Sequence, residues 1–562
     1  MRGRVVNIFK YIAIIYVAFV VCPINTTAQD HTEWSYNLSI YEVNVRQYTK
    51  AGTFAGFRTH LDRLKDLGVG IIWFMPIHPI GVKNRLGSLG SYYSVKDYYG
   101  INPEFGTLQD FKALVDSIHT KGMYVVLDWV GNHTSWDHVL TQSHPEWYEK
   151  NSNGNFIPPH GTNWSDVIQL DYSKQELRNY MIDAMKFWIT ETKIDGFRCD
   201  AAGFIPLDFW TDAVRELKNV NPGTIMIAED DGAKYYTAGF DVTYAWSFYG
   251  FGNGLLKRIA TGVNGANDLD NYVISEQTLF PGKNYRMYFT SNHDENSWFG
   301  TDVELFGSAA EQFNVLSLTF RSVPLIYGGQ EAGLNHRLKF FDKDEITWQS
   351  HPMAERYKIL LQLKRKNNAL WNGAKGEEPV RITTSYDRSI FAFTRQDEKD
   401  KIFALFNLSN QERTFTITGN GYIGTYRDVF NDKSVSLSEN YQMTLPAWGY
   451  QILEKGGTSG TAIDDDPLPQ TFFLSQNYPN PFNPSTMIHY GLPARSRVSL
   501  KVYNVLGQQV ADLINAEQSS GWYETVWNAS VASGLYFYRI DAVSITEPKL
   551  SFTQLKKMLF LK

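Results

Sequence analysis

The sequence predicts an α/β protein built on a parallel (β/α)8 barrel, the TIM barrel, with all-β domains after it. Three observations lead to this fold class. Eight strand-type apolar runs alternate with helical periods between about residues 38 and 370. Several of these runs end in ionisable residues, as barrel strands do at the face where chemistry takes place. After residue 370, short alternating runs replace the helical periods, which is typical of a β-sandwich.

The eight runs are the candidate barrel strands. Most are continuous apolar stretches, as expected of parallel strands that are covered on both faces. They are Ile40 to Val45, Gly70 to Pro76, Tyr124 to Val130, Gly196 to Ala201, Thr224 to Glu229, Asp241 to Trp246, Tyr285 to Ser291 and Pro324 to Tyr327.

Helical periods lie between these runs. From Leu108 to Thr120, apolar residues recur at i, i+3, i+4 and i+7, so one face of a helix would pack on the barrel. Similar stretches are Phe57 to Leu67, Lys174 to Thr190 and Phe209 to Leu217.

The domain boundaries follow from changes in pattern. Within the barrel segment, residues 29–370, the long connection 134–171 is full of turn-forming residues and predicts an inserted subdomain after the third strand. Residues 371–455 are predicted to form an all-β domain, and the Gly-, Ser- and Asp-rich stretch 456–470 a linker. Residues 471–562 are predicted to form a separate small β-sandwich.

Residues 1–28 have the layout of a signal peptide. Basic residues precede an apolar run from Tyr11 to Val21, and small residues follow it. A membrane span needs about 20 apolar residues, so this run favours export over anchoring. If Cys22 leaves with the signal, the mature chain keeps one cysteine, Cys199, and its stability must come from the size of its core.

The composition argues against one class of partner and favours another. A formal net charge of -6 gives no basic surface, so no nucleic acid is expected as a partner. Aromatic residues make up 15% of the chain. Most are expected in the core, but a surplus also suits stacking on the apolar faces of sugar rings.

Four of the strand-type runs end in residues that carry chemistry. Residues 128–133 (DWVGNH), 196–200 (GFRCD), 227–229 (IAE) and 291–294 (SNHD) place an arginine, carboxylates and two histidines at strand ends. Burying so many ionisable groups costs too much free energy to be incidental. Because the strands of a barrel end at its catalytic face, these stretches predict a catalytic mouth, and glycoside hydrolysis is the reaction they favour.

These stretches resemble the alpha-amylase family of glycoside hydrolases over about residues 35–455. The resemblance extends to residues 90–98 (GSYYSVKDY), 105–107 (FGT) and 327–331 (YGGQE). It implies an α-glucan polysaccharide or oligosaccharide as substrate. It also implies roles for individual residues: Asp294 would stabilise the transition state, and His133, Arg198 and His293 would bind substrate. Tyr93 would lie under the sugar that is cleaved, although the neighbouring Tyr92 leaves this register open. Asp128 would support the site by orienting Arg198.

Two further carboxylates fit the reaction on chemical grounds. A retaining glycosidase needs a nucleophile and an acid about 5 to 5.5 Å apart, and Asp200 and Glu229 end adjacent strands. Asp200 is the candidate nucleophile because Arg198, on the same strand face, would keep it ionised. Glu229 is the candidate general acid/base because apolar neighbours and a second carboxylate would raise its pKa. The alternatives are a buried ion pair of Arg198 with Asp200 and a surface carboxylate at Glu229.

The sequence also departs from the family pattern. Gly203 and Phe204 stand where many members have Lys-His, which predicts an apolar acceptor side. Gln169 stands where the family places a calcium-binding aspartate, and Asn132 remains as a possible calcium ligand. Calcium takes six to eight oxygens, so the sequence leaves open whether calcium binds. Ala201, where 1,6-cleaving members tend to have valine, favours α-1,4 bonds.

The C-terminal segment has a resemblance of its own. Residues 474–486 (LSQNYPNPFNPST), 502–507 (VYNVLG) and 533–538 (SGLYFY) are similar to the sorting domain of type IX secretion. The resemblance covers residues 471–562 and implies the type IX secretion machinery as a partner, with export by Sec first. The alternative is a carbohydrate-binding module. A secreted or cell-surface location is therefore expected.

The expected activity is that of a secreted, retaining α-glucan hydrolase of the alpha-amylase type. It would cleave α-1,4 bonds in starch or maltooligosaccharides through a covalent intermediate at Asp200. Two alternatives use the same residues: a cyclodextrin or maltogenic hydrolase, and an α-glucan transglycosylase. A third alternative, from another class, is a non-catalytic glucan-binding surface protein.

Overall fold

The computed structural model describes residues 31–249, 254–280, 284–321, 323–455, 469, 471–477, 480–545 and 549–561. The predicted signal peptide, residues 1–28, lies outside the described residues, as does nearly all of the predicted linker 456–470. Within the described ranges, no helix is long and apolar enough to cross a membrane.

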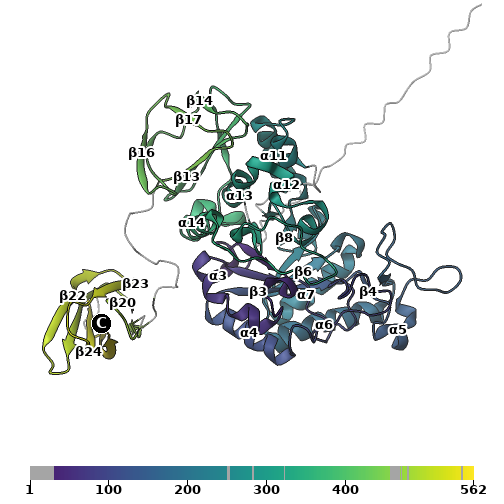
Figure 1. Ribbon diagram of the computed structural model, residues 1–562, viewed down its shortest axis with the longest axis horizontal. Helices are drawn as coiled ribbons and strands as arrows, with labels where there is room; N and C mark the ends of the chain where they lie inside the picture. The colour runs from purple at the N-terminus through teal and green to yellow at the C-terminus, as the bar shows by residue number, and fades with distance from the viewer. Residues whose placement is uncertain are drawn as a thin grey trace, which may run out of the picture.

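Eight parallel strands close into a barrel, of which β3, β6 and β8 are labelled in Figure 1. The order around the barrel is β1-β10-β9-β8-β7-β6-β3-β2. The strands are almost wholly buried on both faces. This barrel, with the β-sheet domains after it, confirms the predicted fold class. The strands are β1 (Ile40–Val43), β2 (Ile71–Phe74), β3 (Tyr124–Val130), β6 (Gly196–Asp200), β7 (Ile225–Ala228), β8 (Val242–Tyr244), β9 (Tyr285–Tyr288) and β10 (Val323–Tyr327).

Some strands end earlier than the apolar runs that predicted them. Val45 and Trp246 were expected in strands, but they begin the short helices α1 (Val45–Tyr48) and α9 (Trp246–Tyr249). At α1 the reason is a helix cap, because the Asn44 side chain accepts a hydrogen bond from the backbone N–H of Gln47. Capping chemistry thus overrides the apolar pattern there.

The predicted helices surround the barrel. α4 (Leu108–Thr120) has the predicted bounds and begins at a capping box between Thr107 and Asp110. The predicted helix 57–67 is instead broken into α2 (Phe54–Arg58) and α3 (Leu61–Leu67). At the break, the Thr59 hydroxyl donates to the Gly56 carbonyl, and such local bonds compete with a continuing helix. The other helices of the barrel are α6 (Gln175–Thr192), α7 (Leu207–Val220), α8 (Lys234–Thr237), α10 (Leu255–Ala260), α11 (Ala266–Leu279), α12 (Asp302–Phe306), α13 (Ala310–Thr319) and α14 (Pro352–Lys366).

The inserted segment begins and ends on a two-stranded sheet. β4 (His133–Ser135) pairs antiparallel with β5 (Val167–Gln169), so that His133 lies opposite Gln169. α5 (Leu140–Ser143) lies between them in the chain. Since β4 follows β3 after two residues, the hairpin fixes the segment beside the C-terminal end of a barrel strand.

Antiparallel sheets follow the barrel. A six-stranded sheet has the order β11-β12-β13-β18-β15-β16, and β14 pairs with β17. Part of this domain packs on the barrel, since Phe391 lies 5.9 Å from Phe320 between ring centroids. The strands are β11 (Val380–Ile382), β12 (Ile390–Gln396), β13 (Lys401–Asn407), β14 (Arg413–Thr416), β15 (Gly424–Asp428), β16 (Lys433–Leu437), β17 (Gln442–Leu445) and β18 (Tyr450–Lys455).

The C-terminal segment forms two further sheets, β19-β20-β23 and β22-β21-β24-β25. They enclose an apolar cluster of their own, with Ile488, Val502 and Ile540 fully buried. The strands are β19 (Phe473–Leu474), β20 (Ser485–Leu492), β21 (Ser496–Asn504), β22 (Gln509–Gln518), β23 (Gly521–Asn528), β24 (Gly534–Ser544) and β25 (Ser551–Phe560).

Candidate active site

One guanidinium joins the two carboxylates that the sequence singled out. Arg198 Nη1 donates to Asp200 Oδ1 at 2.8 Å, and Arg198 Nη2 forms an ion pair with Glu229 Oε1 at 2.6 Å. Asp200 is the last residue of β6, and Glu229 directly follows β7, the neighbouring strand. The two carboxylates therefore lie side by side across one fully buried arginine, which is compatible with the separation of about 5 to 5.5 Å in retaining glycosidases.

A strained turn completes this arrangement. Ala201, directly after Asp200, has a φ of 45°, in the left-handed region that non-glycine residues rarely adopt. In this conformation its backbone N–H donates to Glu229 Oε2 at 2.7 Å. Both oxygens of Glu229 are thus held, one by Arg198 and one by the turn, and a backbone outlier at such a position is typical of functional sites.

Asp128 holds the other side of Arg198. This carboxylate is fully buried on β3 and accepts from Arg198 Nη1 at 3.0 Å. It also accepts from Trp73 Nε1 at 3.2 Å and from the Tyr93 hydroxyl at 3.1 Å. Tyr244 completes the contacts of the guanidinium, since its hydroxyl accepts from Arg198 Nε at 3.1 Å.

Tyr93, and not Tyr92, faces the mouth of the barrel. The Tyr93 hydroxyl lies 2.8 Å from His293 Nε2, and its ring stacks on that imidazole at 5.2 Å between centroids. Tyr92 is buried away from this cluster, with the Arg46 guanidinium 4.1 Å from the centre of its ring. Of the two tyrosines, Tyr93 is therefore the one that contacts the other predicted site residues.

A second charged cluster forms around His293. Its Nδ1 lies 2.5 Å from Glu42 Oε1, and its Nε2 lies 3.4 Å from Asp294 Oδ2. The Asp294 side chain is 36% exposed, so it can reach a ligand in the mouth. The loop after β9 therefore brings Asp294 and His293 to the same face as Asp200 and Glu229.

Burial and charge perturb the ionisation of the site. Burial raises the pKa of Asp200 to about 6, against the lowering effect of Arg198, and Asp128 and Asp294 raise it further. Burial likewise raises the pKa of Glu229 to about 7, with Arg198 opposing and Asp200 adding to the rise. Arg198 thus lowers the pKa of Asp200 and favours its ionised form, while the removal of the carboxylate from water outweighs the ion pair and leaves the pKa above its ordinary value.

The two histidines differ in charge. Burial lowers the pKa of His293, but the Asp294 and Glu42 carboxylates outweigh it and raise the pKa to about 9. Burial lowers the pKa of His133 to about 4, where no carboxylate opposes it strongly. At neutral pH His293 is an imidazolium and His133 is a neutral imidazole.

The oxygens beside His133 do not fit calcium as they stand. Gln169 Nε2 donates to Asn132 Oδ1 at 3.0 Å, to the Asn132 carbonyl at 3.2 Å and to the Leu170 carbonyl at 3.1 Å. Calcium binds through oxygen, whereas this amide presents hydrogen atoms to the same three oxygens. Asn132, the possible calcium ligand, is therefore engaged by a hydrogen-bond donor from the protein.

Exposed aromatic rings lie beside the charged cluster. Trp164, from the inserted segment, is 37% exposed and lies 5.3 Å from His133 and 6.1 Å from Phe204 between ring centroids. Phe204 is 53% exposed and ends the turn that follows Asp200. A Cβ on its neighbour Gly203 would meet Asp230 Oδ2 at 2.6 Å, so a side chain there would require Asp230 or the backbone to shift.

Several residues of the site were missed in the sequence. Glu42 lies within β1, and the only sequence feature that could have identified it is that it is a single acidic residue in an apolar strand. Trp73 and Tyr244 lie inside apolar runs with nothing to set them apart. Trp164 lies in a loop, and its contact with Phe204 joins residues 40 positions apart in the chain.

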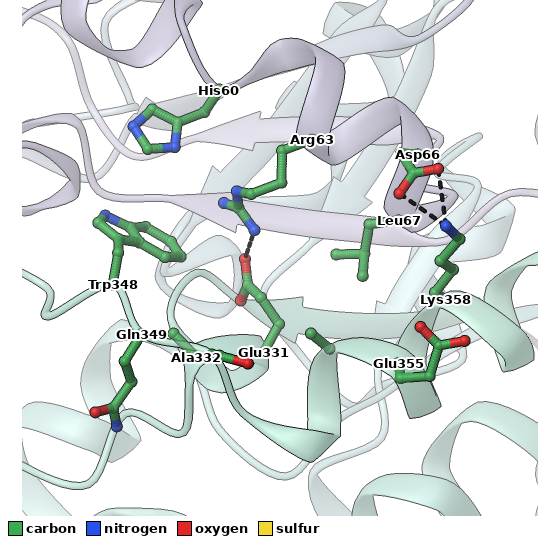
Figure 2. Close-up of a pocket in the computed structure, with 12 residues that line it drawn as sticks. His60, Arg63, Asp66, Leu67, Glu331, Ala332, Trp348, Gln349, Glu355 and Lys358 are labelled. Atoms are coloured by element: carbon green, nitrogen blue, oxygen red, sulfur yellow. Dashed lines mark hydrogen bonds and ion pairs between the residues drawn. The ribbon is translucent and has the colours of Figure 1, made fainter. Parts of the chain in front are cut away.

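A recess of about 400 Å³ lies outside the barrel between α3, α14 and the turn that follows β10 (Figure 2). Two ion pairs lie in it: Arg63 pairs with Glu331 at 2.8 Å, and Lys358 pairs with Asp66 at 2.9 Å. Arg63 also covers the ring of Trp348 at 4.4 Å. These four charged groups and the Trp348 ring are thus engaged within the protein.

Three family models match the chain. The model described as "Alpha amylase, catalytic domain" matches residues 26–167 and 141–414, and "Maltogenic Amylase, C-terminal domain" matches residues 380–452. The model described as "Secretion system C-terminal sorting domain" matches residues 476–550.

Curated and solved proteins agree with these matches. The chain is 29% identical to alpha-amylase 3 of Dictyoglomus thermophilum over 457 residues, which cover 68% of this chain and 87% of that protein. The crystal structure of an alpha-amylase from Lactobacillus plantarum is 34% identical, has a TM-score of 0.66 and covers 75% of this chain and 99% of its own. A maltogenic alpha-amylase structure from Thermotoga neapolitana is 31% identical, also with a TM-score of 0.66, and covers 74% and 98%.

Proposed function

This chain belongs to the alpha-amylase family of glycoside hydrolases, and from that premise we propose that it is a secreted, retaining hydrolase of α-1,4-glucosidic bonds in starch or maltooligosaccharides. The observation that carries the proposal is the pair of carboxylates, Asp200 and Glu229, held by one buried guanidinium. Their pKa values of about 6 and about 7 suit a nucleophile that is ionised and an acid that is protonated near pH 6.5.

The reaction proceeds in two steps. An Asp200 oxygen attacks the anomeric carbon while the glycosidic bond breaks, and Glu229 gives its proton to the departing oxygen. Water then attacks the same carbon, the bond to Asp200 breaks and Glu229 takes up the proton of the water. To Asp294, whose side chain is 36% exposed, we assign the stabilisation of the positive charge that develops on the ring. The imidazolium of His293, whose two ring nitrogens contact Glu42 and Tyr93, holds Asp294 and Tyr93 in place, and Tyr93 supplies a surface below the ring.

Two isosteric substitutions test this assignment. Asp200→Asn and Glu229→Gln should each lower starch hydrolysis at least about 10²-fold, since general acid catalysis alone contributes that much. Asp62→Asn, at a side chain that is 90% exposed, is the matched control and should leave the rate unchanged. Hydrolysis within tenfold of wild type in both site variants would show that these carboxylates have other roles. Product anomers followed by NMR would report retention directly.

A specific observation favours a second candidate within the same class. Trp164 and Phe204 offer exposed rings 6.1 Å apart between centroids, and Phe204 ends the turn that follows Asp200. If these rings line the acceptor side, they would favour a sugar acceptor over water. Relatives include the maltogenic alpha-amylase of Bacillus acidopullulyticus and a cyclomaltodextrinase of a Bacillus species. Product profiles on starch, maltoheptaose and a cyclodextrin would separate an alpha-amylase from a maltogenic hydrolase or a transglycosylase.

The non-catalytic alternative makes a different prediction. A glucan-binding surface protein would be retained on a glucan gel without releasing reducing sugar. The presence of all three carboxylates in the mouth supports an enzyme instead, since Asp200 and Glu229 contact Arg198 and Asp294 contacts His293.

The C-terminal domain supports export by the type IX machinery. The match to a sorting domain covers most of the segment 471–562, which has its own apolar cluster. Deleting residues 471–562 should therefore leave hydrolysis intact and prevent delivery beyond the periplasm. A deletion variant that is still delivered outside the cell would contradict this role.

A further inference from the structure

The oxygens that surround the Gln169 amide come from two segments that must be held together. Asn132 follows β3 and contributes its side-chain oxygen and its carbonyl, while Leu170 follows β5 and contributes its carbonyl. All three lie 3.0 to 3.2 Å from a single nitrogen, Nε2 of Gln169. Asn132 is fully buried and Gln169 is 7% exposed, so water cannot readily replace these bonds.

We propose that the Gln169 side-chain amide takes the place of a divalent cation at this junction, so that the protein holds its inserted segment on the barrel without calcium. Converging carbonyl oxygens repel one another unless something positive lies between them. An NH2 group offers two hydrogen atoms, carries no net charge and is covalently attached. With one hydrogen shared between two oxygens, and with the Leu170 N–H also donating to the Asn132 carbonyl at 3.2 Å, it can bring these oxygens together without a metal.

The surroundings support an amide and not an ion. Calcium sites draw on carboxylates as well as carbonyls, with six to eight oxygens in all. The carboxylate two residues further along, Asp171, is already engaged by the Ser173 backbone N–H at 3.0 Å and by Lys174 at 3.3 Å. The cluster thus has the neutral donors and acceptors of a hydrogen-bond network.

This junction also positions a histidine of the catalytic mouth. Asn132 directly precedes His133, and its Nδ2 lies 3.3 Å from His133 Nδ1. In the β4–β5 hairpin, His133 lies opposite Gln169 itself. Gln169 is therefore a positioning residue: its amide fixes Asn132, and Asn132 and the hairpin fix the neutral imidazole of His133.

The first experiment uses the wild-type protein. Its thermal midpoint, measured with excess EDTA and with excess Ca²⁺, should agree within about 1 °C, and calorimetry with Ca²⁺ should show no binding. A midpoint that falls by several degrees in EDTA, or tight Ca²⁺ binding, would overturn the proposal.

The second experiment restores a carboxylate. Gln169→Glu has nearly the same shape but replaces the NH2 donor group with one more oxygen and a negative charge, so in EDTA its midpoint should fall by about 2 °C or more. Ca²⁺ should return the midpoint towards wild type, because the carboxylate and the three oxygens now form the beginning of a calcium site. Gln175→Glu, at an exposed position of α6, is the matched control and should not respond to Ca²⁺.

The positioning role has its own readout. In EDTA, Gln169→Glu should lose about tenfold in kcat/KM, mainly through KM, and Ca²⁺ should restore it. A Gln169→Glu protein that is as stable as wild type in EDTA, or that ignores Ca²⁺, would contradict the proposal. If this variant does not fold, Gln169→Met decides: without donors or charge it should be less stable than wild type whether or not Ca²⁺ is present. Because midpoints and calcium binding need no substrate, these results stand apart from the proposed hydrolase activity.

Discussion

Asp128 should set the acidic limit of activity, and the change Asp128→Asn tests this. Asp128 and Asp200 each contact Arg198 Nη1, at 3.0 Å and 2.8 Å, so their two contacting oxygens are at most 5.8 Å apart. Two charges at about that distance repel by about 3 kcal/mol at an effective dielectric constant of about 20, which corresponds to about two pKa units. Burial also raises the pKa of Asp128 to about 6, so Asp128 carries only part of its charge at that pH. Its removal should therefore lower the pKa of Asp200 by one to two units.

The assay is the pH profile of kcat/KM on a maltooligosaccharide. For the wild type, kcat/KM plotted against pH should give a bell-shaped curve with limbs near pH 6 and pH 7, because Asp200 must be ionised and Glu229 protonated. The two apparent pKa values belong to the two carboxyl groups as a coupled pair. In Asp128→Asn the acidic limb should move down by one to two pH units while the maximum falls, since Arg198 and Tyr93 lose a charged partner. An acidic limb that stays in place or moves up would refute the electrostatic reasoning. Asp62→Asn again serves as the control.

Three further substitutions have defined outcomes. Glu42→Gln should lower the pKa of His293 from about 9, so its loss of kcat/KM should be greater at pH 8 than at pH 6; an equal loss at both would contradict this assignment. Gly203→Ala should lower the thermal midpoint by several degrees, since overpacking costs about 1 to 3 kcal/mol and Asp230 is held by Gly232 and Tyr235; an unchanged melting curve would show that Asp230 gives way. Phe204→Ala should lower the ratio of transfer to hydrolysis about threefold or more with maltose as acceptor, whereas Tyr386→Ala, 45% exposed in the all-β domain, should leave the product ratio unchanged.

The barrel strands were predictable because each is a local apolar run. β3 has the predicted bounds, and the other strands differ by a few residues at their ends, where capping by residues such as Asn44 decides between strand and helix. The break between α2 and α3 was not predictable from periodicity, since apolar residues continue across it. It depends on one hydroxyl, that of Thr59, bonding to the backbone.

The residues of the candidate site that lie at or just after the ends of strands could be predicted from the sequence. Several that lie within strands or in loops could not. Asp200, Glu229 and Asp294 follow apolar runs, so their residue types stand out. Glu42 contacts His293 across 251 positions of the chain, and Trp164 contacts Phe204 from a loop. Nothing in the local sequence of either pair specifies the other member.

The sequence by itself determined the barrel, the order of its strands and the family to which the chain belongs, because apolar runs and strand-end motifs are local patterns. Only the tertiary structure decided how the charges are shared. It places Asp128, Asp200 and Glu229 on one guanidinium, leaves His293 charged and His133 neutral, and puts the Gln169 amide among three oxygens. These properties depend on burial and on distances of a few ångströms between distant segments, and a pKa or a metal preference is set by that surrounding space and not by residue type.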